Sequence, residues 1–219
     1  MTTAPLSLHH LIRPATSEKE KVPVIFLFHG YGSNEEDLFS FASELPPEIC
    51  VISARAPYSM TPFGYAWYAI NFDATSGKWS DVEQAKESMN KIVFFIKEAC
   101  EAYHLDSSSV SLLGFSQGTV LSLAVALSYP ELIKNVIALS GYIDENTLIA
   151  SYKAKDHSHL NIYASHGKVD QVIPLSWAQK TPAFLDALGI ENTFEEFPVG
   201  HGVAPQNFHS MNSWLKDKI

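Results

Sequence analysis

The chain has 219 residues, 46% of them hydrophobic, and a mean hydropathy close to zero, which is the composition of an ordinary globular protein. Its formal net charge of −9 argues against nucleic acid or an anionic membrane surface as a partner. This length supports one sizeable core, so we expect a single domain over residues 1–219.

Cysteine and histidine spacing gives no sign of a disulfide or a metal site. Cys50 and Cys100 fall in a predicted strand and a predicted helix, and we interpret both as reduced core residues. His157 and His159 form only an H-x-H pattern in a polar loop. The N-terminus does not resemble a signal peptide, and the apolar run at 22–28 is too short to span a membrane. We therefore expect a cytoplasmic protein without a metal, a cofactor or stable membrane insertion.

Apolar runs rich in valine, isoleucine and leucine predict strands that alternate with helices. Continuous rather than alternating hydrophobicity is typical of parallel strands covered on both faces. The predicted strands lie at 22–28, 49–54, 110–113, 136–139, 160–164 and 193–197. The predicted helices lie at 34–44, from 80 onward, after 116, at 175–188 and at the C-terminus. This alternation predicts parallel βαβ units with right-handed crossovers, and hence an α/β fold with a doubly wound, mostly parallel sheet flanked by helices.

Two helix starts and one extra strand complete the prediction. The Ser-x-x-Glu sequences that begin at Ser33 and Ser80 are capping boxes, which predict helices beginning just after each serine. Residues 6–12 could form a short strand that pairs as a hairpin with the strand at 22–28.

A serine lies between two glycines where a predicted strand gives way to a predicted helix, in Gly114-Phe-Ser-Gln-Gly118. Strand, sharp turn and helix are the context that makes the G-x-S-x-G pattern informative. The glycines leave room for a strained turn that projects the Ser116 hydroxyl away from the sheet. The free N–H groups of the helix N-terminus then face whatever the serine attacks. We predict Ser116 as a nucleophile, against the alternative of a chance Gly/Ser turn.

A serine hydroxyl needs an adjacent base, and a neutral imidazole suits that role near neutral pH. His29 and His166 follow predicted strands but directly precede glycine, which is typical of residues that shape a loop. His201 follows the last predicted strand, lies between two glycines and comes after Ser116 in the chain. The serine–acid–histidine order of such sites therefore favours His201 as the base.

The acid that orients the imidazole should follow a strand between the serine and the histidine. Asp170 follows the penultimate predicted strand, and Asp144 follows the strand before it. The turn residues Gly167 and Pro174 around Asp170 favour it, and Asp144 remains the alternative.

An oxyanion hole needs two donors placed where negative charge develops. One should be the backbone N–H of Gln117, directly after the nucleophile. The other should come from the loop after the first central strand, and there the glycine-flanked Tyr31 is the best candidate through its backbone N–H.

These segments together resemble a known family. His-Gly-Tyr-Gly at 29–32, Gly-Phe-Ser-Gln-Gly at 114–118, His-Gly-Lys-Val-Asp-Gln-Val-Ile-Pro at 166–174 and Gly-His-Gly at 200–202 occur in this order. The chain resembles the phospholipase/carboxylesterase branch of the α/β-hydrolases, over roughly residues 22–215. The resemblance implies an α/β-hydrolase fold, Ser116, Asp170 and His201 as the triad, and Tyr31 and Gln117 as oxyanion donors. One departure is Thr119, because the acyl-protein thioesterases of this branch typically have a second glycine there.

Residues 55–80 form a long segment dense in aromatic residues, and such a loop is usually functional. We expect its part from 63 to 72 to form a wall of the acyl pocket, with Trp67, Tyr68 and Phe72 near the substrate. The alternative is that these rings cover the sheet as ordinary core. Val172, close to the candidate acid, is the other predicted pocket residue.

The site and its length define the predicted function. We expect a serine carboxylesterase that hydrolyses short- to medium-chain acyl esters through an acyl-enzyme intermediate. At 219 residues the chain has no room for a separate lid domain, which favours a fairly open site. An acyl-thioesterase or a lysophospholipase is the alternative within this class, and a non-catalytic binding protein on the same fold is the alternative outside it. The expected partner is a small-molecule ester, and a homodimer is left open.

Overall fold

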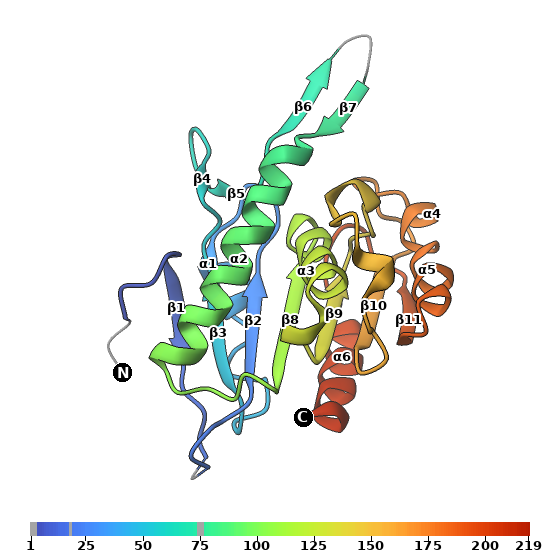
Figure 1. The fold of residues 1–219 in the computed structure, drawn as a ribbon. Helices are drawn as coiled ribbons and strands as arrows, with labels where there is room; N and C mark the ends of the chain where they lie inside the picture. The colour runs from blue at the N-terminus through green and yellow to red at the C-terminus, as the bar shows by residue number, and fades with distance from the viewer. Residues whose placement is uncertain (1–3, 18, 74–76) are drawn as a thin grey trace.

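The computed structural model describes residues 4–17, 19–73 and 77–219. A seven-stranded sheet, in the order β1-β3-β2-β8-β9-β10-β11, forms the middle of the molecule (Figure 1). All of its neighbouring strands are parallel except β1, which runs antiparallel to β3. The strands of this sheet are β1 (His10–Arg13), β2 (Val24–Phe28), β3 (Cys50–Ala54), β8 (Val110–Phe115), β9 (Asn135–Leu139), β10 (Asn161–Gly167) and β11 (Glu191–Phe197).

The direction of winding changes beside β2. From β2 the chain passes outward to β3, and it later returns to β8 on the other side of β2. From β8 each further strand is added outward as far as β11. Ligands of doubly wound sheets bind at the carboxyl ends of the strands at such a switch point. The loops after β2 and β8 are therefore the places where a site is expected.

Helices cover both faces of this sheet (Figure 1). One face packs against helices α2, α3 and α5, and the other packs against α1 and α6. In β2 the side chains of Phe26 and Phe28 enter the first core, whereas Ile25 and Leu27 enter the second. Burial on both faces explains why these strands are continuously apolar. The helices are α1 (Glu35–Phe39), α2 (Val82–Ala102), α3 (Gln117–Ser128), α4 (Leu175–Ala178), α5 (Thr181–Ala187) and α6 (Pro205–Lys218), with 3-10 turns η1 (Pro130–Leu132), η2 (Glu145–Thr147) and η3 (Tyr152–Ala154).

The long aromatic segment contains two small hairpins rather than an irregular loop. Strands β4 (Tyr58–Ser59) and β5 (Tyr65–Ala66) pair with each other, as do β6 (Ile70–Asp73) and β7 (Gly77–Ser80). The β6–β7 hairpin projects from the body of the molecule beside the start of α2 (Figure 1). Within the described residues, no helix combines the length and the hydrophobicity needed to cross a membrane.

Several predicted boundaries need correction. β1 pairs with β3 and not with β2, so the predicted hairpin is wrong. The two N-caps are Asn34 and Asp81, one residue later than the predicted serines, and their side chains accept from the N–H groups of Glu36 and Gln84. The helix predicted at 175–188 is divided into α4 and α5, because Pro182 lacks the N–H that would continue an unbroken helix.

Candidate active site

The turn between β8 and α3 carries Ser116 in a strained conformation. Ser116 has φ 53° and ψ −114°, outside the regions that residues with a side chain normally occupy. A Cβ on Gly118 would collide with the carbonyl oxygen of Phe28, and a Cβ on Gly114 would collide with the backbone of Gly118. Glycine is therefore required two residues on either side of the serine, because the first turn of α3 packs directly on β2 and β8.

Three loops from different strand ends bring Ser116, His201 and Asp170 into one hydrogen-bonded chain. The Ser116 hydroxyl lies 2.9 Å from His201 Nε2, to which it can donate. The other ring nitrogen of His201, Nδ1, lies 2.7 Å from Asp170 Oδ2 and donates to it. The order serine, base, orienting carboxylate is the arrangement that nucleophilic catalysis by serine requires.

The Asp170 carboxylate is fully buried and held by a tight turn. Its Oδ1 accepts from the N–H groups of Val172 and Ile173 at 2.8 and 2.9 Å. Burial alone would raise the pKa of Asp170, but the hydrogen bonds from His201, Ile173 and Val172 outweigh it and hold the pKa below its usual value. Asp170 is therefore the ionised partner that keeps the proton of His201 on Nδ1.

The other histidines at strand ends serve the loops. His29 Nδ1 donates to the carbonyl of Gly30 at 2.7 Å, and its Nε2 accepts from the N–H of Ala56 at 3.1 Å. Burial lowers the pKa of His29, so the ring stays neutral in this role. His166 Nε2 donates to the carbonyl of Ile173 at 2.9 Å and lies 3.3 Å from Asp170 Oδ2, which braces the turn that carries the acid.

The alternative acid, Asp144, has a different environment. It is the N-cap of η2, and its Oδ1 accepts from the backbone N–H and the side-chain amide of Asn146 at 3.1 and 2.9 Å. The structure thus joins His201 to Asp170 and leaves Asp144 in the loop after β9.

The predicted oxyanion donors flank the nucleophile. Gln117 is the first residue of α3, so its N–H has no acceptor within the helix. Tyr31 lies in the loop after β2, which the β4–β5 hairpin holds: Gly32 N–H donates to the Tyr65 carbonyl at 2.9 Å, and Tyr65 N–H donates to the Ser33 carbonyl at 2.8 Å. Among the residues that the structure describes, neither the Tyr31 N–H nor the Gln117 N–H donates to a protein acceptor. Both are thus free to meet a developing oxyanion.

The structure places Trp67 outside the predicted pocket. It is completely buried in the core, and its indole N–H donates to the His29 carbonyl at 2.9 Å. Its backbone N–H donates to Gln117 Oε1 at 2.8 Å. The ring packs edge-on against Phe28, with centroids 5.4 Å apart. Trp67 therefore supports the nucleophile turn from behind and does not line the cavity.

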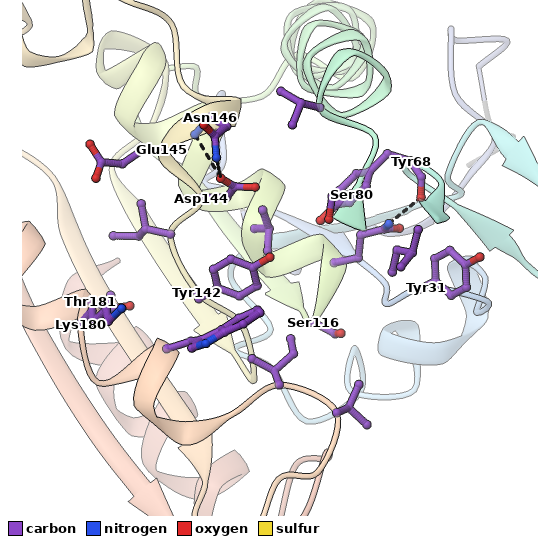
Figure 2. A pocket seen from close by; sticks show the side chains of 18 of the residues that line it. Tyr31, Tyr68, Ser80, Ser116, Tyr142, Asp144, Glu145, Asn146, Lys180 and Thr181 are labelled. Atoms are coloured by element: carbon purple, nitrogen blue, oxygen red, sulfur yellow. Dashed lines mark hydrogen bonds between the residues drawn. The ribbon is translucent and has the colours of Figure 1, made fainter. Parts of the chain in front are cut away.

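A cavity of about 590 Å³ opens beside Ser116 (Figure 2). Of the predicted pocket residues, Tyr68 and Val172 line it, whereas the side chain of Phe72 lies outside the described part of the chain. Its other apolar and aromatic lining residues are Tyr31, Ile70, Val82, Val120, Tyr142, Ile143, Ile173, Trp177 and Phe184. Most of these wall residues were not predicted from the sequence. Tyr142 lies in the loop after β9, three residues past the end of the strand, and its place beyond a strand end was a usable signal.

The α/β-hydrolase class is defined by a doubly wound sheet with a serine on a strained turn at the switch point. A histidine and an aspartate from later strand ends complete its site. The model of the phospholipase/carboxylesterase family matches residues 11–219. The chain therefore belongs to the phospholipase/carboxylesterase family of α/β-hydrolases.

Individual relatives carry two kinds of name. The chain is 31% identical over 157 residues to "Acyl-protein thioesterase 1 homolog 1" of Dictyostelium discoideum, a match covering 70% of this chain and 68% of that one. It is 28% identical over 156 residues to "Probable carboxylesterase SOBER1-like" of Arabidopsis thaliana, where 70% of this chain spans 59% of the relative's length. The crystal structure of esterase PE8 superposes with a TM-score of 0.83 at 25% identity, over 97% of this chain and 99% of that one.

Proposed function

We propose that this protein is a serine carboxylesterase that uses Ser116 as nucleophile, His201 as general base and Asp170 as the group that orients His201. The observation that carries this proposal is the continuous hydrogen-bonded chain from Ser116 Oγ through both nitrogens of His201 to Asp170. In this mechanism His201 takes the Ser116 proton as Oγ attacks the acyl carbonyl, and the N–H groups of Tyr31 and Gln117 receive the oxyanion. His201 then returns the proton to the leaving alcohol, and water releases the acyl group by the same route.

The position of the cavity supports an assignment of the two sides of the substrate. The leaving group must lie beside His201, because it receives a proton from Nε2. His201 is not among the residues that line the cavity, whereas Ser116 and Gln117 are. The cavity therefore suits the acyl part of the ester. Its volume of about 590 Å³ and its mainly apolar walls support short- to medium-chain acyl groups.

A thioester substrate is the second candidate, because several relatives bear the name of an acyl-protein thioesterase. Both reactions pass through the same acyl-enzyme and differ in the leaving group. The kcat/KM values of three octanoyl substrates separate the alternatives. The p-nitrophenyl ester reports carboxylesterase activity, octanoyl-CoA reports thioesterase activity, and octanoyl lysophospholipid reports lysophospholipase activity.

The catalytic proposal is tested with Ser116→Ala. The variant should lose fluorophosphonate labelling and nearly all p-nitrophenyl ester hydrolysis, while its melting temperature stays close to that of the parent. Ser107→Ala is the matched control, since Ser107 is an exposed serine near the opposite end of β8. Ester hydrolysis that survives in Ser116→Ala, or a parent protein that the probe does not label, would overturn the proposal and favour a non-catalytic binding protein.

A further inference from the structure

The cavity carries a carboxylate that the triad does not use. Asp144 lines the cavity, as does Ser116, and its side chain is half-buried in the loop after β9. Its Oδ1 is occupied by Asn146, as described above. In the part of the chain that the structure describes, Asp144 Oδ2 has no hydrogen-bond donor. One oxygen of this carboxylate is therefore available to a ligand in the cavity.

Aromatic rings line the cavity together with Asp144. Figure 2 shows the Tyr142 ring directly below the Asp144 carboxylate, with Ser116 further down. The Tyr142 ring meets the Trp177 ring edge-on, with centroids 5.0 Å apart, and Trp177 presents 47% of its surface to solvent. Burial raises the pKa of Tyr142, and the charge of Asp144 adds to that shift, which agrees with a carboxylate close to the ring. Burial raises the pKa of Tyr68 as well, and Tyr142 and Asp144 both add to that rise.

The remaining charges of the cavity do not neutralise Asp144. Glu145 and Lys180 are exposed and have opposite signs. Glu145 also accepts a hydrogen bond from the hydroxyl of Tyr152 at 2.8 Å, on the side of η3. Among the residues whose side chains the structure describes, which excludes those of 71–79, no ion pair to Asp144 occurs. A half-buried carboxylate thus lines the same cavity as Tyr142 and Trp177.

We propose that the cavity selects acyl groups that end in a positive charge, such as an ω-trimethylammonio acyl chain, with the cation held between the Asp144 carboxylate and the rings of Tyr142 and Trp177. This inference rests on the proposed carboxylesterase function and names its substrate class. Aromatic faces attract cations, most strongly where water is excluded, and a nearby carboxylate adds to that attraction. A neutral acyl end would displace water from Asp144 without replacing its hydrogen bonds, so the same group disfavours simple alkyl chains.

The test uses three p-nitrophenyl esters of nearly equal size. The acyl groups are 5-(trimethylammonio)pentanoyl, its neutral isostere 6,6-dimethylheptanoyl, and 6-carboxyhexanoyl. Each kcat/KM is divided by the rate of spontaneous hydrolysis in the same buffer, which removes intrinsic differences in reactivity. The cationic ester should exceed its neutral isostere about three- to thirtyfold, the range expected for a partly desolvated cation–π site. The anionic ester should be the poorest substrate.

Two variants separate the local carboxylate from the general negative charge of the protein. In Asp144→Asn the cationic-to-neutral ratio should fall toward one, while the amide oxygen that replaces Oδ1 can still accept from Asn146. Asp156→Asn is the matched control, because Asp156 is exposed and its Oδ1 likewise accepts from the backbone N–H two residues later, at Ser158. The control removes the same unit of charge and should keep the ratio of the parent. A ratio near one in the parent, or an unchanged ratio in Asp144→Asn, would overturn the inference.

A binding measurement makes the inference independent of catalysis. Calorimetry on Ser116→Ala should show tighter binding of 5-(trimethylammonio)pentanoate than of 6,6-dimethylheptanoate, and Asp144→Asn in that background should remove the difference. If the parent hydrolyses no ester but this difference is present, the carboxylesterase proposal fails and the cation site stands. If neutral esters are hydrolysed but no difference is found, only the cation site fails.

Discussion

The backbone N–H of Trp67 donates a 2.8 Å hydrogen bond to the side-chain oxygen of Gln117. The same amide group donates through its Nε2 to the Tyr68 carbonyl at 2.7 Å. The Trp67 carbonyl accepts from the hydroxyl of Ser88 on α2. The aromatic segment is thus tied both to the residue after the nucleophile and to a neighbouring helix. Trp67 thus helps to fix Gln117, the residue after Ser116, whereas Tyr68 and Ile70 of the same segment line the cavity.

Trp67→Ala should therefore destabilise the protein without changing acyl selectivity. Removing a fully buried aromatic side chain costs about 3–5 kcal/mol of unfolding free energy. Trp177→Ala is the contrasting variant, because Trp177 lines the cavity and is 47% exposed. It should cost little stability and alter the acetyl-to-octanoyl preference, at about 0.8 kcal/mol per methylene no longer buried. Denaturant unfolding and kcat/KM across the acyl series measure both effects. The reverse pattern would indicate that Trp67 lines the acyl pocket.

Thr119 ties the nucleophile turn to the next strand. Its hydroxyl lies 2.7 Å from the Gly114 carbonyl and 2.6 Å from the Leu139 carbonyl, at the ends of β8 and β9. A Cβ on Gly141 would collide with the Thr119 side chain, so the threonine fills the space above that glycine. Thr119 is buried and is not among the residues that line the cavity. Its departure from the usual glycine therefore concerns the packing of the turn rather than contact with the substrate.

Thr119→Val should lower the unfolding free energy by about 1–3 kcal/mol, because it keeps the volume but removes the hydroxyl that donates to these buried carbonyls. Thr119→Ser keeps the hydroxyl and should cost only about 1 kcal/mol for the lost methyl group. Neither variant should change the ratio of ester to thioester hydrolysis. A changed ratio with unchanged stability would instead make Thr119 a determinant of substrate type.

The sequence predicts which three side chains meet at the nucleophile turn better than it predicts the walls of the cavity. The strained serine turn, the strand-end histidine and the acid obey local rules of spacing and chain order, so Ser116, His201 and Asp170 can be selected from the sequence. Trp67 and Trp177 obey no such rule. Whether a ring in an irregular segment enters the core or a cavity depends on partners such as Gln117 and Tyr142, which lie far away in the chain. The partner of β1 was missed for the same reason, since a strand at a sheet edge carries no mark of its neighbour.

A buried ion pair at the start of α1 predicts a loss of stability in acid. The Glu35 side chain is 4% exposed, and Arg55 Nε donates to it at 2.6 Å. Burial would raise the pKa of Glu35, but the hydrogen bonds and charge of Arg55 outweigh it, and the folded pKa is lowered. The unfolded chain then binds the proton more readily than the folded protein does. The ion pair therefore makes its full contribution to the free energy of unfolding above about pH 4.3, and this contribution is lost as the pH falls through the folded pKa of Glu35.

Glu35→Gln should remove this pH dependence. At neutral pH the free energy of unfolding of the variant should be about 1–3 kcal/mol lower than that of the parent, which is the usual contribution of a hydrogen bond to a charged group. Solvent moderates this loss, because the Arg55 side chain is 31% exposed. The difference from the parent should shrink as the pH is lowered below about 4, because the parent then loses the same interaction. Glu36→Gln, at an exposed neighbouring position, is the control and should follow the parent at every pH. A difference that stays constant from neutral pH to pH about 3 would contradict the argument.

Asp170→Asn tests how the orientation of His201 controls the reaction. An asparagine amide can donate to Nδ1 of the imidazole and so favour the tautomer with its proton on Nε2, which cannot accept the Ser116 proton. The corresponding change in a serine protease lowers kcat by about 10⁴, and we expect a loss of several orders of magnitude here.

Asp106→Asn is the control, because Asp106 accepts in a similar turn, from the N–H of Ser108, at the opposite end of β8. Single-turnover kinetics would measure the chemical step directly, and fluorophosphonate labelling should slow in parallel. Because its pKa is held low, Asp170 is ionised in the parent at neutral pH and accepts from His201 Nδ1, an interaction that the asparagine amide cannot reproduce. A loss below about tenfold in Asp170→Asn would mean that another group orients His201.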